Sequence, residues 1–198
     1  MSPVPDLYAI REATEADLPD ILEIYNERVL NSTCLFIYEP VTLENRLAWF
    51  KETKENNYPI IVAVDNATQK TIAYASLGAF RGKPAYNLST EISVYIHPEH
   101  HRKGLGSVLV KEILCIAREM KFRSIIASIT SENKASSAMF QKFGFKLAAV
   151  FHDVGYKFGR FLDCDFYEYI IHETTVSDPT KAPQFVPFPW GSYQYPTA

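Results

Sequence analysis

Apolar residues recur along this chain at two spacings, and each spacing predicts one type of secondary structure. Between residues 16 and 30 they return every three or four positions, which predicts an amphipathic helix. That stripe consists of Leu18, Ile21, Leu22, Tyr25 and Val29. Thr14 and Asp17 supply its N-cap and an acidic residue three positions later. Thr42 opens a second helix, which we expect to end near Asn56.

Runs of β-branched and other apolar residues, bounded by turn residues, predict strands. They cover residues 8–11, 60–64, 72–80, 91–96, 124–130, 147–151 and 162–171. The last two form an antiparallel pair, with bends at residues 153–155 and at Gly159 between them. Further helices are expected over 105–120 and 134–143, the second ended by Gly144. This order predicts an α+β, or mixed α/β, fold with one sheet flanked by helices.

The chain has 198 residues, of which 47% are hydrophobic, and this is enough for one well-buried domain. We assign residues 1–172 to that domain. Residues 173–198 hold five prolines and no hydrophobic period, which predicts a tail that is disordered or lies along the surface. Its aromatic side chains could dock onto this or another subunit; they are Phe185, Phe188, Trp190, Tyr193 and Tyr195.

Charge and cysteine content indicate which partners and which cellular compartment to expect. The net charge is −3 and no large basic block occurs, so a nucleic-acid partner is not indicated. Cys34, Cys115 and Cys164 are widely spaced and odd in number, which argues against a disulfide framework and for a reducing compartment. No signal peptide and no run of about 20 apolar residues is present. We therefore expect a soluble, cytoplasmic protein that does not bind membranes.

The most informative stretch runs from Ser93 to Ser107, where a β-rich run passes through a basic, glycine-containing turn into an apolar helix. Gly104 and Gly106 let the backbone approach a ligand closely, and the first turn of the helix offers unpaired N–H groups. The adjacent basic residues, 102 and 103, add positive charge. The stretch predicts a site for a pyrophosphate, although its spacing matches neither a P-loop nor the dinucleotide fingerprint.

Glu91 lies on the strand that leads into this turn. With a period of two, it shares one face with Ser93 and Tyr95. The opposite face carries Ile92, Val94 and Ile96. A carboxylate on a largely apolar strand is a candidate general base, because an apolar setting favours proton uptake. The alternative, a carboxylate on a solvated sheet face, fits the pattern equally well.

The order strand, [Gln/Arg]-x-x-Gly-x-Gly, helix is the coenzyme A signature of the GNAT acetyltransferases. Residues 101–106 resemble it except at the first position, which is His101. Phe80-Arg81 and the run Thr-Glu-Ile-Ser-Val-Tyr-Ile at residues 90–96 resemble the phosphinothricin and methionine sulfoximine N-acetyltransferase branch. The run Val-Gly-Tyr-Lys-Phe-Gly-Arg-Phe-Leu-Asp at 154–163 is rather specific to this branch. The resemblance covers roughly residues 8–170 and leaves out the tail.

This resemblance implies the GNAT fold, acetyl-CoA as cosubstrate, no metal and a homodimer. It implies acetyl transfer to the α-amine of a small amino-acid-like acceptor by direct attack, with Glu91 as general base. The coenzyme is expected at Val94, Tyr95, Ile96, Arg102, Lys103, Gly104, Leu105, Gly106, Ser107 and Asn133. The acceptor is expected at Arg81, Glu91, Ile92 and Ser93, with Arg81 pairing with its carboxylate.

Two other functions stay open. One is a GNAT acetyltransferase of a protein N-terminus, a lysine or a polyamine. The other is a noncatalytic acyl-CoA-binding module, because Phe140 occupies a position where GNAT enzymes commonly have a tyrosine and this branch a histidine, and it cannot donate a proton. Glu91 argues against that module. For His97, His100 and His101 we expect no metal, since no helix places them on one face.

Overall fold

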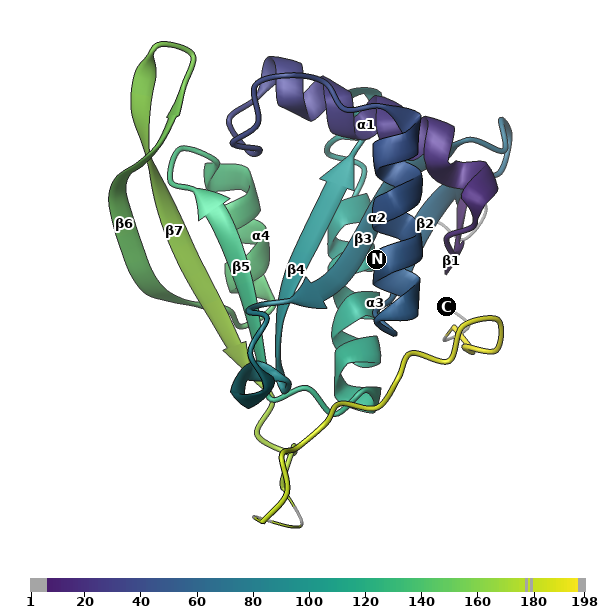
Figure 1. Ribbon diagram of the computed structural model, residues 1–198. Helices are drawn as coiled ribbons and strands as arrows, with labels where there is room; N and C mark the ends of the chain where they lie inside the picture. Colours follow the sequence, from purple (N-terminus) through teal and green to yellow (C-terminus); the bar gives the residue numbers. More distant parts are fainter. Residues whose placement is uncertain (1–6, 177, 179, 196–198) are drawn as a thin grey trace.

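The computed structural model describes residues 7–176, 178 and 180–195, in which seven strands form one mixed sheet (Figure 1). The strands are β1 (Tyr8–Glu12), β2 (Ile60–Asp65), β3 (Thr71–Ala79), β4 (Ser89–Ile96), β5 (Ser124–Thr130), β6 (Lys146–Lys157) and β7 (Arg160–Ile170). Their order is β1-β2-β3-β4-β5-β7-β6, and β4–β5 is the parallel pair among antiparallel neighbours. The predicted mixed sheet flanked by helices is therefore confirmed.

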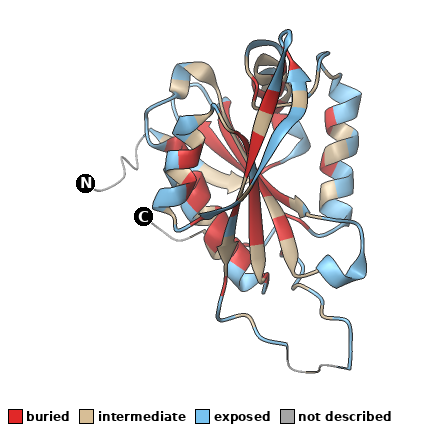
Figure 2. Cartoon of the chain, turned by 90° about the vertical axis from the view of Figure 1, so that its left-hand side faces the viewer, coloured by how far each residue is buried: buried red, intermediate tan, exposed pale blue. Residues whose placement is uncertain are grey.

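Helices cover both faces of this sheet. They are α1 (Leu18–Asn31), α2 (Leu43–Glu55), α3 (Leu105–Glu119) and α4 (Lys134–Lys142), with 3-10 turns at η1 (Glu15–Asp17), η2 (Pro84–Tyr86) and η3 (Pro98–His100). Successive residues of β2 point to opposite faces, so Ile60 and Val62 pack with α1 and α2, while Ile61 packs with α3. The buried residues accordingly concentrate on the central strands (Figure 2). No described helix is long and apolar enough to cross a membrane.

Two predicted boundaries are wrong. The first helix begins at Leu18, after η1, because the carboxylate of Asp17 bonds to the amide of Thr14 and holds the chain in a separate turn. The predicted bends at residues 153–155 lie inside β6, where the register with β7 shifts. The true turn is formed by Phe158 and Gly159, both at positive φ (50° and 76°), the backbone twist that a two-residue hairpin requires.

The tail packs against the domain. The Val186 amide donates to the Met120 carbonyl oxygen at the end of α3, and the Gly191 amide donates to Glu12 of β1. Phe188 is 3% exposed and joins the core around α3. Phe185 stacks on Phe122 with 4.8 Å between ring centroids. The described part of the tail thus runs along the surface and contributes aromatic side chains to the core.

Asp17 ties the first strand to the third. Its carboxylate accepts two hydrogen bonds from the guanidinium of Arg11, at 2.7 and 2.8 Å, and one from the Thr71 hydroxyl at 2.6 Å. Burial by itself raises the pKa of Asp17, but the bonds from Arg11, Thr71 and Thr14 outweigh it and lower the pKa to about 2. The folded protein therefore favours the charged carboxylate.

We expect Asp17→Asn to lower the free energy of unfolding by about 2 kcal/mol at pH 7. A carboxylate whose pKa is lowered by folding stabilises the protein above its unfolded pKa, about 3.9, and this contribution is lost as the pH falls toward 2. Urea unfolding between pH 7 and pH 2 should therefore show the gap between wild type and variant closing in that range. Glu15→Gln, in the same turn but exposed, is the control; a gap that does not change with pH contradicts the assignment.

Candidate active site

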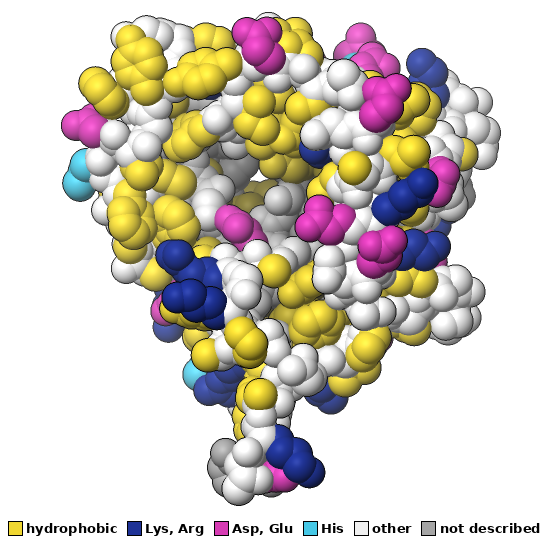
Figure 3. Space-filling view, viewed as in Figure 1, with side chains coloured by type: hydrophobic (Ala, Val, Ile, Leu, Met, Phe, Trp, Pro, Cys, Tyr) yellow, Lys and Arg dark blue, Asp and Glu magenta, His cyan; other side chains and the backbone are white. Residues whose placement is uncertain are grey.

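The two parallel strands at the centre of the sheet, β4 and β5, move apart along their length. The ladder between β4 and β5 joins only Ser89 to Ser124, Thr90 to Ile125 and Glu91 to Ile126, and beyond these pairs the strands diverge. A cavity of about 1050 Å³ lies in the opening and hollows this face of the molecule (Figure 3). Its walls come from β4, β5, the turn before α3, α4, residues 31–35 and the β6–β7 turn. This volume suits a large ligand.

One end of the cavity attracts anions. Gly104, at φ +82°, is the N-cap of α3, and a Cβ there would meet nothing within 4 Å. Among the described residues we find no acceptor for the amides of Leu105 and Gly106, so they and the helix dipole face the cavity. Arg102 and Ser107 line the same end, whereas Lys103 does not. These groups could bind a pyrophosphate, and the role of the turn stays a prediction.

The two glycines of this turn have different roles. Gly104 supplies the left-handed backbone and leaves room for a ligand. A Cβ on Gly106 would lie 2.7 Å from the Met139 sulfur and 3.2 Å from Ile96 Cδ1. Gly106 thus permits α3 to pack against α4 and β4, in addition to exposing its amide.

Glu91 lies where the ladder ends, and its side chain faces the cavity. Its Oε1 accepts a hydrogen bond of 2.6 Å from the hydroxyl of Ser128 on β5. Tyr95, on the same face, packs against the rings of Tyr25 and Tyr74, and this burial raises its pKa. Ile92, Val94 and Ile96 pack toward α3, so the predicted alternation of faces is confirmed. All six residues from 91 to 96, Ser93 included, line the cavity.

Asn133 and Phe140 line the cavity from the α4 side. Asn133 is the N-cap of α4, and its Oδ1 accepts from the Ser136 amide at 3.2 Å. Phe140 is 5% exposed and packs edge-on against Phe145. An apolar ring therefore stands in the wall, as expected from the sequence, and offers no proton.

Residues 31–35 close the cavity opposite the turn, and the sequence pattern gave no sign of how they are held. The ammonium of Lys157 donates to the carbonyl oxygens of Val29, Ser32 and Leu35 at 2.6, 2.8 and 2.8 Å. Thr33 donates to the Glu132 carboxylate at 2.6 Å. The segment is therefore fixed to β6 and to the end of β5.

Two arginines that were not selected as site residues from the sequence line the cavity. Arg28 reaches it from α1, and Arg160 reaches it from β7 while paired with Glu132 at 2.7 Å. Arg81 is exposed, lies with its guanidinium 5.3 Å from the centre of the Phe80 ring, and is not part of the cavity wall. A carboxylate held inside the cavity would meet Arg28 or Arg160 before Arg81.

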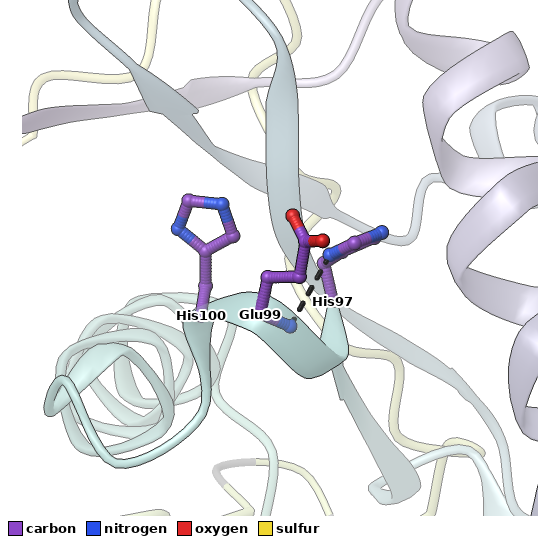
Figure 4. A group of neighbouring side chains, drawn as sticks. All are labelled: His97, Glu99 and His100. Carbon is purple, nitrogen blue, oxygen red and sulfur yellow. Dashed lines mark hydrogen bonds between the residues drawn. The ribbon is translucent and has the colours of Figure 1, made fainter.

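The histidines beside the turn make separate contacts. The ligand atoms of His97, Glu99 and His100 lie within 4.8 Å of one another, and the two rings stand on either side of the Glu99 side chain (Figure 4). Nδ1 of His97 accepts from the Glu99 amide at 3.4 Å, and the Lys103 ammonium lies 3.5 Å from His100 Nδ1. Desolvation and this cation lower the pKa of His100. His101 instead bonds to the Ile96 carbonyl oxygen. These contacts stabilise the turn between β4 and α3.

Comparison with known proteins agrees with this geometry. The family model described as "Acetyltransferase (GNAT) domain" matches residues 10–165. An L-methionine sulfoximine/L-methionine sulfone acetyltransferase of Pseudomonas aeruginosa is 38% identical over 174 residues, which are 88% of this chain and 97% of the relative.

Two solved structures are also similar. A GNAT superfamily phosphinothricin acetyltransferase from Sinorhizobium meliloti, in complex with AcCoA, has a TM-score of 0.83 at 34% identity, covering 88% of this chain and 94% of that one. A ribosomal-protein-alanine N-acetyltransferase from Brucella melitensis has a TM-score of 0.79 at 38% identity, covering 82% and 99%.

Replacing Lys157 with Met should lower the free energy of unfolding by about 2 kcal/mol, because three carbonyl oxygens lose a charged donor. Lys146→Met, on the same strand and exposed, should change it by less than about 0.5 kcal/mol. Urea unfolding followed by circular dichroism measures both. Equal effects for the two variants would contradict a stabilising role for the Lys157 hydrogen bonds.

Proposed function

The chain belongs to the GNAT family of acetyltransferases, and we propose that it transfers the acetyl group of acetyl-CoA to the α-amine of a small amino-acid-like acceptor. The observation that carries this proposal is the cavity itself, which has an anion-attracting helix end on one side and a carboxylate on the other. Relatives named for methionine sulfoximine and phosphinothricin support the acceptor class.

The residues present fit acetyl-CoA. The free amides of Leu105 and Gly106, with Arg102 and Ser107, would hold the pyrophosphate at the start of α3. The β5 side of residues 92–96 has no strand partner, so backbone groups near Val94 are available to the acyl chain. Asn133 would contact the coenzyme from the N-terminus of α4. Lys103, outside the wall, would add charge from nearby.

Glu91 would act as general base. An amino-acid α-amine is largely protonated at neutral pH, and it attacks only after the ammonium proton has gone to Glu91, directly or through a water. The new C–N bond forms at the thioester carbon as the C–S bond breaks, and amides near Val94 would donate to the developing oxyanion. The leaving thiolate takes its proton from water, because Phe140 carries none.

The arginines differ in whether they can reach an acceptor carboxylate inside the cavity. Arg28 and Arg160 line the cavity, which supports them as partners for a carboxylate bound beside Glu91. Arg81, Ile92 and Ser93 were predicted as acceptor contacts. Ile92 and Ser93 line the wall, whereas Arg81 would serve only an acceptor that extends past the cavity mouth. Its role stays a prediction.

The test of the proposal is Glu91→Gln, which keeps the shape of the side chain and removes the base. We expect kcat/KM for an amino-acid acceptor to fall by about 100-fold or more, with acetyl-CoA binding unchanged. Glu168→Gln, an exposed carboxylate on β7 outside the cavity, should keep wild-type rates. Full activity of Glu91→Gln would rule out the proposed base.

Acetyl-CoA-dependent thiol release over a panel of acceptors tests the acceptor class in the same assay. The panel holds methionine sulfoximine, phosphinothricin, common amino acids, polyamines and peptides. Turnover confined to a peptide would favour a protein acceptor, which the similarity to the Brucella enzyme supports as the second candidate. Acetyl-CoA binding without turnover would favour the noncatalytic module.

We further propose a homodimer formed through the β6–β7 hairpin. Exposed aromatic and apolar side chains gather there, and we call them the hairpin patch: Phe36, Tyr38, Val154, Tyr156, Phe158 and Phe161. They are continuous, since Tyr38 donates to the Tyr156 carbonyl oxygen at 2.7 Å and the Tyr156 and Phe161 rings are 5.1 Å apart. A patch of this kind is typical of an interaction surface, and a second copy is the partner that the family resemblance implies.

Sedimentation equilibrium should give a mass near twice 22.6 kDa for the wild type. Phe161→Glu, which places a charge in the patch at a position 63% exposed, should give the single-chain mass. Val186→Glu, exposed on the tail, is the control and should remain dimeric. A dimer that survives Phe161→Glu would place the interface elsewhere.

A further inference from the structure

We infer that Ser128 is a positioning residue for the proposed base: its hydroxyl holds the Glu91 carboxylate turned into the cavity. This inference rests on the proposed function, since it concerns the same acetyl transfer. Nothing in the sequence pattern marks Ser128, which is one small polar residue in a strand of isoleucine and alanine.

The strand register explains why this serine faces the carboxylate. Glu91 pairs with Ile126 at the last position of the β4–β5 ladder, so their side chains lie on the same face of the sheet. Ser128 is two residues farther along β5 and therefore returns to that face. There the strands have begun to diverge, and the Ser128 hydroxyl reaches across the opening to Glu91 Oε1 at 2.6 Å.

The contact leaves one carboxylate oxygen for chemistry. Oε1 accepts from Ser128, and no described residue bonds to Oε2. The side chain is thus fixed by one oxygen while the other is free to receive the ammonium proton of the acceptor.

The experiment is the steady-state kinetics of Ser128→Ala. We expect kcat to fall about tenfold, because the Glu91 carboxylate is no longer held toward the acceptor amine, while KM for the acceptor changes little. KM for acetyl-CoA should stay unchanged. Ser128→Thr, which keeps the hydroxyl, should restore most of the rate, and Ser124→Ala, on the same face of β5 but outside the cavity, is the control.

Two results separate this inference from the proposed function. In a Glu91→Gln background, Ser128→Ala should cause no further loss. If Glu91→Gln is inactive while Ser128→Ala keeps the wild-type kcat, or loses rate without rescue by threonine, Ser128 has no positioning role and the base assignment stands. If Glu91→Gln is fully active, the proposed function itself fails.

Discussion

The structure depends on the point at which two parallel strands stop pairing. β3 holds β4 and β7 holds β5 along their lengths, but β4 and β5 hold each other at only three residue pairs. The sheet is therefore two antiparallel halves joined at one end. Backbone groups that would normally be satisfied within the sheet are left facing a cavity. Glu91, Ser128 and the backbone near Val94 lie on these two edges, and the pyrophosphate turn and Asn133 lie at the helix ends beside them.

Local sequence patterns predicted the features that local physics determines. The glycine turn, the helix it opens and the facing of Glu91 follow from neighbours within a few residues. Ser128 and Lys157 could not be found in this way. The first needs the register of a parallel pair whose strands are far apart in sequence, and the second needs the path of residues 31–35, which carry no periodicity. Arg81 was selected by resemblance, and its loop takes it away from the cavity.

The part of the cavity wall formed by residues 31–35 is held by polar contacts. Lys157 is 2% exposed and faces three carbonyl oxygens with no carboxylate partner among the described residues. Such an arrangement is directional, so it fixes the backbone of residues 31–35 at defined distances from β6. An apolar contact of equal strength would let this segment shift along β6, because apolar contacts are not directional. The wall opposite the pyrophosphate turn thus keeps its shape although it is an irregular segment.

The tail links segments that are far apart in the sequence. Gly191 bonds to Glu12, a contact between residues 179 positions apart, and the tail also bonds to the end of α3. Phe185 packs on the rings of Tyr58 and Phe122. Removing the tail would expose these two rings to water, and exposed aromatic surface favours association between copies of the chain.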